Sequence, residues 1–564
     1  MKKSLLFAFT AICSVGSAAA FDVEVDGIAY NKLSEDEKTL EVTFHTPAAD
    51  DYSKPTGGYS GDVVVPSTVS VDGDTWTVSA IGYGAFASST LTSLSLPSTL
   101  VSIGENAFYK MNLAEINIPD GVESIGYQAF NLSAVTKVVL PLTLKTLGNY
   151  VFTFCRQLAE IDMSACVITE LPQYTFNQCQ VLEEVKIPAT VEKVGNYAFN
   201  SCRALKEMEI TEGVTELGSN IFSGCSSLEK VVLNAKVDAV PESMFNNCTA
   251  LKTVVLPTGL KSVGYRSFMH CSGLESISLP STVTGIGVQA FSDCSSLESI
   301  TLPDGLTDLN ELAFEDCKAL DNVVLPQAIT VVAKSLFSGR SSLKNVTLAE
   351  GTTELMDYAF ASCSSLSSID FPESITKIGA YAFKKCSSFE TISLPEGVTE
   401  IAKNTFDGCT GLKSATVHDG ITKIGSSAFN GCTALEDIYL GSGLQTMDSY
   451  VFYGCKAINN VESYALTAPK GSSNCFESAV YKSAVLKILP SASGYDIESP
   501  WSAFENVAKD LSGIEAVGAE SVVRTVDVYN LSGVKLRRGV NQADALDGLP
   551  SGLYICGGHK VYVK

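Results

Sequence analysis

Histidine and positive charge are scarce in this 564-residue chain, and each shortage excludes a class of function. Only four histidines are present, which leaves little material for His-rich metal sites or acid–base sites. Lysine and arginine number 39 against 62 acidic residues, a net charge of -23. Nucleic acid and anionic lipid are therefore unsuited as main partners, because both require a basic surface. No apolar run reaches 18 residues, so we expect no transmembrane span in the processed chain.

The overall composition is that of a folded protein. Hydrophobic residues make up 45% of the chain and charged residues 18%, which is too apolar for a disordered polypeptide. A chain of 564 residues is too long for one compact core, so several domains or a stacked repeat are expected.

The first twenty residues have the pattern of a secretory signal peptide. Lys2 and Lys3 precede a short apolar stretch, and Ala18 to Ala20 provide a small-residue cleavage site. Cys13 raises the alternative of a lipoprotein signal, but the preceding Thr-Ala-Ile lacks the small residue that such a site normally has. We predict that residues 1–20 are removed and that the protein is exported.

A phenylalanine recurs at a nearly constant interval through most of the chain. The interval is 22 residues three times, 24 once and 23 twelve times. The seventeen positions are Phe86, Phe108, Phe130, Phe152, Phe176, Phe199, Phe222, Phe245, Phe268, Phe291, Phe314, Phe337, Phe360, Phe383, Phe406, Phe429 and Phe452. The surrounding consensus is C-x-x-L-x-x-I-x-L-P-x-x-V-x-x-I-G-x-x-A-F-x-x. An internal period of this length predicts a stack of like coils.

The spacing within one unit predicts its local structure. Leu274, Ile277 and Leu279 form an L-x-x-I-x-L block whose last two members alternate as in a short strand. The Pro that often follows has no N–H and should end the strand. A Gly after the second apolar pair, present in ten of seventeen units, is expected to allow a tight bend. About six apolar positions cannot be buried by one unit alone, so neighbouring units must stack.

The unit L-x-x-I-x-L-P…I-G-x-x-A-F-x-x-C resembles the BspA-type leucine-rich repeat family over residues 60–470. The resemblance implies a leucine-rich repeat solenoid of about 17 repeats of 23 residues, with short parallel strands on its concave face. This family occurs on secreted and surface proteins of bacteria and some protists. The resemblance therefore implies contact with host extracellular or cell-surface proteins, or with other cells. The Asn ladder of the generic leucine-rich repeat is absent, and Cys takes a comparable once-per-repeat place.

Thirteen of the 17 cysteines lie three residues after the repeat Phe. They are Cys155, Cys179, Cys202, Cys225, Cys248, Cys271, Cys294, Cys317, Cys363, Cys386, Cys409, Cys432 and Cys455, and Arg340 interrupts the column. Disulfides would be the usual interpretation in an exported chain. Side chains stacked in parallel, however, keep Cβ atoms about 5 Å apart, whereas a disulfide needs roughly 3.8 Å. We predict reduced thiols that pack as small hydrophobic side chains.

The residues that alternate with the buried ones in each strand block are expected to point outward on the concave face. In the middle units they are small, neutral and able to form hydrogen bonds. The candidate ligand-binding residues are Thr253, Ser276, Ser278, Ser299, Thr301, Asn322, Asn345 and Thr347. Such an array suits extended protein contact, and the chain is expected to be a monomeric surface adhesin or interaction scaffold. Glycan binding or nutrient capture is the alternative, although Tyr439 is the one aromatic residue on this face, and a structural spacer is a third possibility.

Residues for catalysis or cofactor binding do not form a recognisable constellation. The chain contains no G-x-S-x-G, H-E-x-x-H, P-loop or dinucleotide fingerprint. His270 beside Cys271 is expected to be a surface His next to a core Cys, and His418 a turn residue. Glu207 and Glu209 could in principle serve glycoside hydrolysis, but nothing else in the sequence marks a pocket there. We predict a non-enzymatic protein without metal or cofactor.

The two ends depart from the period. Residues 21–59 are expected to form an N-terminal β cap, and residues 471–512 a closing cap or linker. Residues 513–564 read as short strands with Gly turns. This tail resembles the C-terminal sorting domains of type IX secretion, with Gly533, Gly552, Tyr554 and Lys560 at the motif positions. The resemblance implies export or attachment to the outer membrane; an ordinary terminal β-domain is the alternative.

Overall fold

The computed structural model describes residues 21–47 and 56–511 together with four strands of the C-terminal segment, for which we describe the backbone. The chain divides into two compact units, Met1–Ala508 and Lys509–Lys564. The predicted signal peptide lies outside the described residues. The boundaries proposed above for the domains stay predictions.

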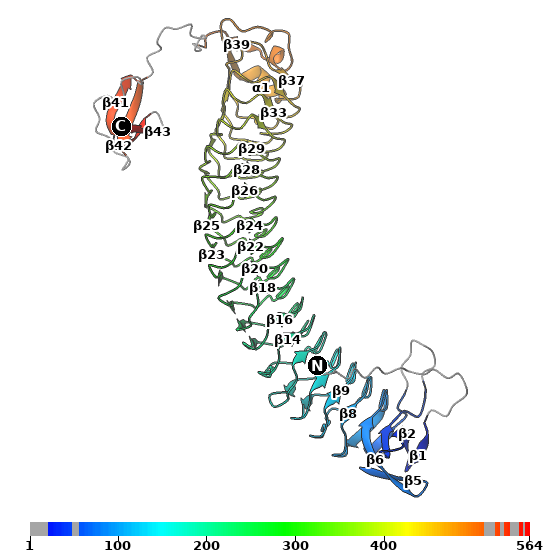
Figure 1. Cartoon of the computed structure of the whole chain (residues 1–564). Coiled ribbons are helices and arrows are strands. Elements are labelled where there is room, and N and C mark those ends of the chain that lie inside the picture. The colour runs from blue at the N-terminus through cyan, green and yellow to red at the C-terminus, as the bar shows by residue number, and fades with distance from the viewer. Residues whose placement is uncertain are drawn as a thin grey trace. The chain divides into compact units, whose positions relative to one another are not determined.

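The first unit is a β-solenoid of about 19 turns of roughly 23 residues, which confirms the predicted leucine-rich repeat architecture. The turns stack one upon the next from β6 to β39 (Figure 1). The additional turns come from both ends of the repeat region, where the pattern is too irregular for the Phe period to mark them.

Each turn contributes to two series of parallel strands. The strands of the L-x-x-I-x-L block form the long-strand ladder: β4 (Ser60–Val64), β7 (Thr90–Ser95), β10 (Lys137–Val139), β12 (Glu160–Asp162), β15 (Glu207–Ile210), β17 (Lys230–Leu233), β19 (Thr253–Val255), β21 (Ser276–Ser278), β23 (Ser299–Thr301), β25 (Asn322–Val324), β27 (Asn345–Thr347), β30 (Thr391–Ile392), β32 (Ser414–Val417), β34 (Asp437–Leu440), β36 (Asn460–Ser463), β38 (Val485–Ile488) and β39 (Asn506–Ala508). Pairing in this ladder is interrupted at several turns.

A second series, the short-strand ladder, was not predicted. Its members after β6 are two-residue strands at the V-x-x-I positions: β8 (Ser102–Ile103), β9 (Ser124–Ile125), β11 (Thr146–Leu147), β13 (Glu170–Leu171), β14 (Lys193–Val194), β16 (Glu216–Leu217), β18 (Ala239–Val240), β20 (Ser262–Val263), β22 (Gly285–Ile286), β24 (Asp308–Leu309), β26 (Val331–Val332), β28 (Glu354–Leu355), β29 (Lys377–Ile378), β31 (Glu400–Ile401), β33 (Lys423–Ile424), β35 (Thr446–Met447) and β37 (Lys470–Gly471). Two residues are too few to show a period of two in the sequence.

The register places equivalent residues of successive turns side by side. Ser276 pairs with Ser299 and Ile277 with Ile300, so a buried position always meets a buried position. The Pro after the strand block ends the strand as expected, and its carbonyl then accepts a turn hydrogen bond. In one representative turn the Val283 N–H donates to the Pro280 carbonyl at 3.0 Å.

The repeat phenylalanines form one continuous stack through the interior. Ring centroids of successive turns lie 4.9 to 6.2 Å apart from Phe86 to Phe476. Most neighbouring rings are near parallel, as for Phe268 and Phe291 at 4°. Each stacked pair adds about 0.5–1.5 kcal/mol beyond burial of its area. The stack therefore couples every turn to the next.

The cysteine column has a specific hydrogen-bonding role that composition alone did not reveal. Each of the thirteen column thiols donates to the carbonyl of the repeat Phe in the preceding turn, with Sγ···O distances of 3.0 to 3.3 Å. None of the fifteen described cysteines forms a disulfide, and all are buried. Cys fits this place because it is both a small hydrophobe and a weak donor.

The predicted reason for the repeat Gly was wrong. Gly126 and Gly148 do not have positive φ; the left-handed positions of these turns are occupied by residues such as Gln128 and Tyr150. A Cβ on Gly148 would lie 2.3 Å from the Gly126 carbonyl carbon of the preceding turn. Gly is needed here because successive backbones approach closely, not because the chain bends.

The ends of the solenoid are closed by less regular elements. At the start lie β1 (Val23–Val25), β2 (Ile28–Ser34), β3 (Thr39–Val42), β5 (Thr68–Val71) and β6 (Asp74–Ile81). β3 pairs in parallel with β6, which continues into β8 of the short-strand ladder. At the far end lie the helix α1 (Ser478–Ser483) and a single 3-10 turn (Trp501–Ala503). The Trp501 indole N–H donates to the Pro469 carbonyl at 2.7 Å and the ring is fully buried.

The second unit contains a small antiparallel sheet, as predicted for the tail. Its order is β41 (Lys535–Asn541), β40 (Thr525–Asn530), β42 (Gly552–Cys556) and β43 (His559–Val563). Gly552 and Tyr554 lie on β42, and Lys560 lies on β43 opposite Ile555. Gly533 lies outside the described residues. The type IX sorting role stays a prediction.

Candidate functional site

All eight predicted ligand-binding residues lie at exposed positions of the long-strand ladder. The strands β19 to β27 show the exposed–buried–exposed pattern, so two side chains of every turn point outward. With Val255 and Val324 the eight residues complete an array of ten side chains on five successive turns, which we call the uncharged band. Its assignment to the concave side of the solenoid stays a prediction.

The uncharged band offers hydrogen-bonding groups that the protein itself does not use. Within the described residues, the hydroxyl and amide side chains of the band form no hydrogen bond with another protein group. Val255 and Val324 are 46% and 58% exposed and contribute apolar area between them. Charged side chains flank the band, with Lys230 before it and Asp370 after it. The band is thus a flat, neutral surface with regularly spaced donors and acceptors.

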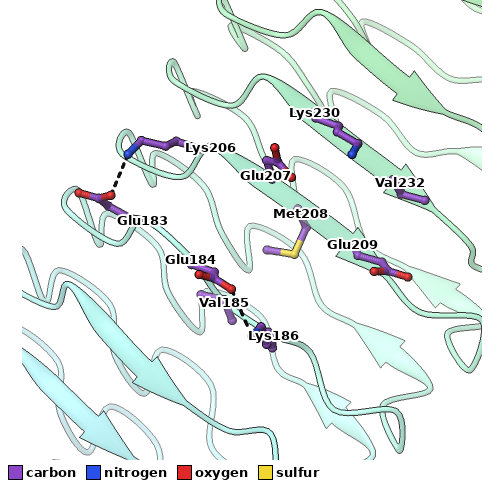
Figure 2. A pocket seen from close by; sticks show the side chains of 10 residues that line it. All are labelled: Glu183, Glu184, Val185, Lys186, Lys206, Glu207, Met208, Glu209, Lys230 and Val232. Carbon is purple, nitrogen blue, oxygen red and sulfur yellow. Dashed lines mark hydrogen bonds and ion pairs between the residues drawn. The ribbon is translucent and has the colours of Figure 1, made fainter.

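A groove of about 580 Å³ lies beside the band, over three turns of the same face. Figure 2 shows the side chains that line it: Glu183, Glu184, Val185, Lys186, Lys206, Glu207, Met208, Glu209, Lys230 and Val232. It forms where the long-strand ladder is interrupted, since the turn around Glu184 makes only a single bridge to Glu160 instead of a strand. The interruption follows the 24-residue interval between Phe152 and Phe176, which inserts one residue before this turn.

The charges of the groove are largely matched within it. Lys206 Nζ lies 2.8 Å from the Glu183 carboxylate, and Lys186 Nζ lies 3.5 Å from Glu184 (Figure 2). The hydrogen bond from Lys206 lowers the pKa of Glu183, and the same bond raises the pKa of Lys206. Both pairs are exposed, so their contribution to stability is small.

Glu207 and Glu209 lie on this groove, which the sequence did not reveal. Both are exposed on the same strand, and Glu209 accepts a hydrogen bond from the Asn234 amide at 2.9 Å. Glycoside hydrolysis requires one carboxyl to act as an acid in surroundings that favour its protonated form. Glu207 and Glu209 are instead both exposed and lie beside lysines on an open groove.

The histidines take the structural roles expected of them. His270 Nδ1 lies 2.9 Å from the Asp293 carboxylate at the surface, whereas the thiol of Cys271 is buried and donates to the Phe245 carbonyl. His418 replaces the turn Pro, and its carbonyl accepts from the Ile421 N–H at 3.1 Å. Among the described residues, no group of three or more His, Cys, Asp or Glu is placed to hold a metal ion.

Tyr439, the aromatic residue expected on the long-strand face, lies next to a charged cluster. It pairs in register with Glu462, whose carboxylate accepts from Asn460 at 3.2 Å, Tyr464 at 3.0 Å and Lys487 at 3.0 Å. Partial burial acts to raise the pKa of Glu462, but these hydrogen bonds outweigh it and the pKa is lowered. The C-terminal part of this face is therefore polar and internally bonded, unlike the uncharged band.

Comparison with known proteins identifies the repeat. The model of the "BspA type Leucine rich repeat region" family matches residues 79–169, 169–277, 261–387 and 353–482, which together cover more than half of the chain. The protein belongs to the BspA-type leucine-rich repeat family. This membership supports a non-catalytic binding role and a location at the bacterial cell surface or outside the cell. No curated protein matches the whole chain or any part of it.

Three solved structures of leucine-rich repeat proteins are similar to this BspA-type protein. A leucine-rich repeat protein from Bacteroides ovatus is 23% identical over 79% of this chain and 95% of that one, with a TM-score of 0.47. A leucine-rich cell surface protein from Faecalibacterium prausnitzii is 23% identical over 79% and 95% of the two chains, with a TM-score of 0.27. A leucine-rich repeat protein from Eubacterium ventriosum is 23% identical over 57% and 95%, with a TM-score of 0.33.

The BspA-type solenoid contains almost no helix. In the part of the chain that the structure describes, no helix has the length and hydropathy needed to cross a lipid bilayer.

Proposed function

We propose that this protein is an exported adhesin or interaction scaffold that binds an extracellular or cell-surface protein of a host, or of another cell, through the uncharged band. The observation that carries the proposal is the set of exposed hydroxyl and amide groups that form no hydrogen bond with the protein. Each contact would be weak, but a partner that spans several turns gains from their repetition. The neutral band also imposes no charge requirement on the partner.

The proposal is tested by placing charge on the band. In the double variant Ser299→Lys with Asn322→Lys, we expect at least a tenfold loss of binding to immobilised extracellular matrix proteins, measured by surface plasmon resonance. The matched control is Thr307→Lys with Thr330→Lys, which adds the same charge eight residues later in the same two turns. Equal loss in both variants would show that charge alone, and not the band, decides binding.

The alternative is that the same surface binds a glycan. It is tested by measuring binding to arrayed glycans as well as to matrix proteins. If the unmodified protein binds arrayed glycans and no matrix protein, and the band variant abolishes that binding, the partner of the band is a glycan. The band has no aromatic side chain for a sugar ring to stack on, which is why a protein partner is favoured.

We also propose that residues 1–20 direct export and that residues 513–564 act as a type IX sorting tail. The β-rich tail with Gly552, Tyr554 and Lys560 on neighbouring strands supports this proposal. Deletion of residues 513–564 should change where the protein accumulates, followed by immunoblotting of cell envelope and medium. Unchanged secretion and attachment would reject the sorting role.

A further inference from the structure

Four tyrosines form a column on successive turns beside the short-strand ladder. Tyr127, Tyr150, Tyr174 and Tyr197 follow β9, β11, β13 and β14. The ring centroids of Tyr150 and Tyr174 are 4.5 Å apart at 7°, and those of Tyr174 and Tyr197 are 4.7 Å apart at 7°. Tyr127 lies 5.6 Å from Tyr150, with its plane turned by 69°. We call this set the tyrosine column.

Three of the four column tyrosines have a backbone conformation that is unfavourable for tyrosine. Tyr150, Tyr174 and Tyr197 have φ values of 61°, 59° and 57°, in the left-handed region. Bulky side chains rarely adopt this conformation, whereas Asn tolerates it, as Asn220 does at the equivalent position of the next turn. The same position is left-handed in the other turns as well, as at Arg266 and Leu312, so this conformation is imposed by the repeat.

The hydroxyl groups of the tyrosine column are available to a ligand. Within the described residues, none of the four phenol hydroxyls forms a hydrogen bond with another protein group. The Tyr127 side chain is 39% exposed, and its rotated ring keeps a face that Tyr150 does not cover. A partly exposed aromatic ring and four hydroxyls without protein partners therefore lie on successive turns.

A groove of about 320 Å³ lies next to the tyrosine column, although no column tyrosine is among the residues that line it. Three of its side chains are the amides that immediately precede column tyrosines, namely Asn149, Gln173 and Asn196. Lys193 lies between Glu170 at 3.5 Å and Glu216 at 3.8 Å, which balances much of the charge. Amides offer both donors and acceptors, so this groove suits a ligand rich in hydroxyl groups.

We propose that the groove and the tyrosine column form a binding site for a neutral linear glycan that lies along successive turns. One sugar ring would pack on the exposed part of the Tyr127 ring, since the C–H face of a pyranose packs well on an aromatic ring. Its neighbours would exchange hydrogen bonds with Asn149, Gln173 and the phenol hydroxyls. Glu170 and Glu216 disfavour an acidic polysaccharide. A peptide that adds as a strand is disfavoured because β14 is paired on both sides.

A second tyrosine pair, in the repeat position of Tyr150, Tyr174 and Tyr197, provides the control. Tyr358 and Tyr381 stack at 4.5 Å and 2°, as in the tyrosine column. The ammonium groups of Lys384 and Lys403, however, lie 5.3 and 5.8 Å from the Tyr381 ring centroid. The Tyr381 ring is therefore covered by lysines and by Tyr358, so it should not bind glycan.

The test measures binding of the full chain to cellohexaose, xylohexaose, mannohexaose and maltohexaose by isothermal titration calorimetry, with heparin as the acidic comparison. We expect binding of at least one neutral hexasaccharide. Tyr127→Ser should weaken that binding at least tenfold, and Gln173→Ala should weaken it severalfold. Tyr358→Ser with Tyr381→Ser should change it less than twofold.

Three results would overturn the proposal: no binding of any neutral hexasaccharide, binding of heparin alone, or equal losses in the Tyr127 variant and the control. Tyr127 is exposed and outside the interior stack, so the variant should keep the melting temperature of the unmodified chain, which confirms that it is folded. The band variant Ser299→Lys with Asn322→Lys should leave glycan binding unchanged. This last result separates the glycan site from the proposed protein-binding function.

Discussion

The interior and the surface of the solenoid repeat in different ways. Inside, the same Phe and Cys return in turn after turn, and the ring spacing stays between 4.9 and 6.2 Å. Outside, the same period carries lysines and glutamates in one region, hydroxyl residues in the next and tyrosines along another edge. The difference shows that stacking restricts the buried positions, whereas each exposed position can change with little effect on the fold. Binding specificity can therefore vary along one scaffold.

Alkaline pH should have the largest effect, and most of that effect should come from the interior. Burial raises the pKa of the Cys155 and Cys225 thiols to about 12, and most other column thiols are shifted in the same direction. Below the unfolded thiol pKa of about 8.5, both states are protonated and this contribution to stability is complete. As pH rises from there towards the folded pKa, the unfolded state ionises and the native state does not.

Each such thiol then removes about 1.4 kcal/mol of folding free energy per pH unit. Urea unfolding at pH 7, 9 and 10, with reductant present, measures how the free energy of unfolding changes with pH. The double variant Cys225→Ala with Cys248→Ala lacks two of these thiols. Its free energy of unfolding should therefore fall less steeply with pH, by the contribution of two thiols. Equal stability at pH 7 and pH 10 would contradict buried, protonated thiols.

Removal of one interior ring should cost far more than removal of an exposed one. Phe245→Ala takes a fully buried ring from the middle of the stack, and we expect a loss of about 3–5 kcal/mol in the free energy of unfolding. Tyr265→Ala removes a ring that is 38% exposed and should cost less than about 1 kcal/mol. Both are measured by denaturant unfolding. Similar losses in the free energy of unfolding for the two variants would contradict the proposed difference between interior and surface positions.

Arg340 is the exception inside the column, and its replacement should stabilise the protein. The side chain is fully buried between the turns of Cys317 and Cys363, donates to the Leu336 and Ser338 carbonyls, and leaves Nε without a partner. The adjacent Phe314–Phe337 pair has the widest spacing of the stack at 6.2 Å. Arg340→Cys should restore the thiol hydrogen bond to the preceding turn and raise stability by about 1–4 kcal/mol.

The control for that variant is Arg203→Cys, the same substitution at an exposed position of another turn. It should change the melting temperature little under reducing conditions. A destabilised Arg340→Cys protein would mean that the buried guanidinium makes stronger contacts than its two carbonyl hydrogen bonds.

The smallest effect is expected at the surface ion pairs that link successive turns. Lys206→Met removes the 2.8 Å contact with Glu183, and both side chains are more than 60% exposed. Loss of such a fully exposed pair should leave the free energy of unfolding almost unchanged. The thermal midpoint should stay within about 2 °C of the unmodified protein, measured by calorimetry at low and at physiological salt. A larger, salt-sensitive drop would show that the surface ladder also supports the stack.

Much of the interior could be predicted from residue spacing. The buried Phe, the strand at Ile277, the turn at Pro280 and the thiol column all follow from one repeated pattern of apolar residues. The strands at Gly285 and its equivalents were missed because two residues carry no detectable alternation. The long-strand face was placed correctly as exposed, yet the groove beside Glu207 depends on an interruption of the ladder that the repeat pattern does not mark.

The sequence alone determined the period, the buried positions and the family, because burial of a 23-residue unit requires apolar residues at the same positions in every copy. The tertiary structure alone decided which atoms meet across turns: the thiol with the carbonyl of the preceding Phe, the Gly148 backbone with that of Gly126, and Tyr150 with Tyr174. These contacts join residues about 23 positions apart, and they exist only once the turns are stacked. A linear pattern shows what recurs, whereas the stacking geometry determines what touches.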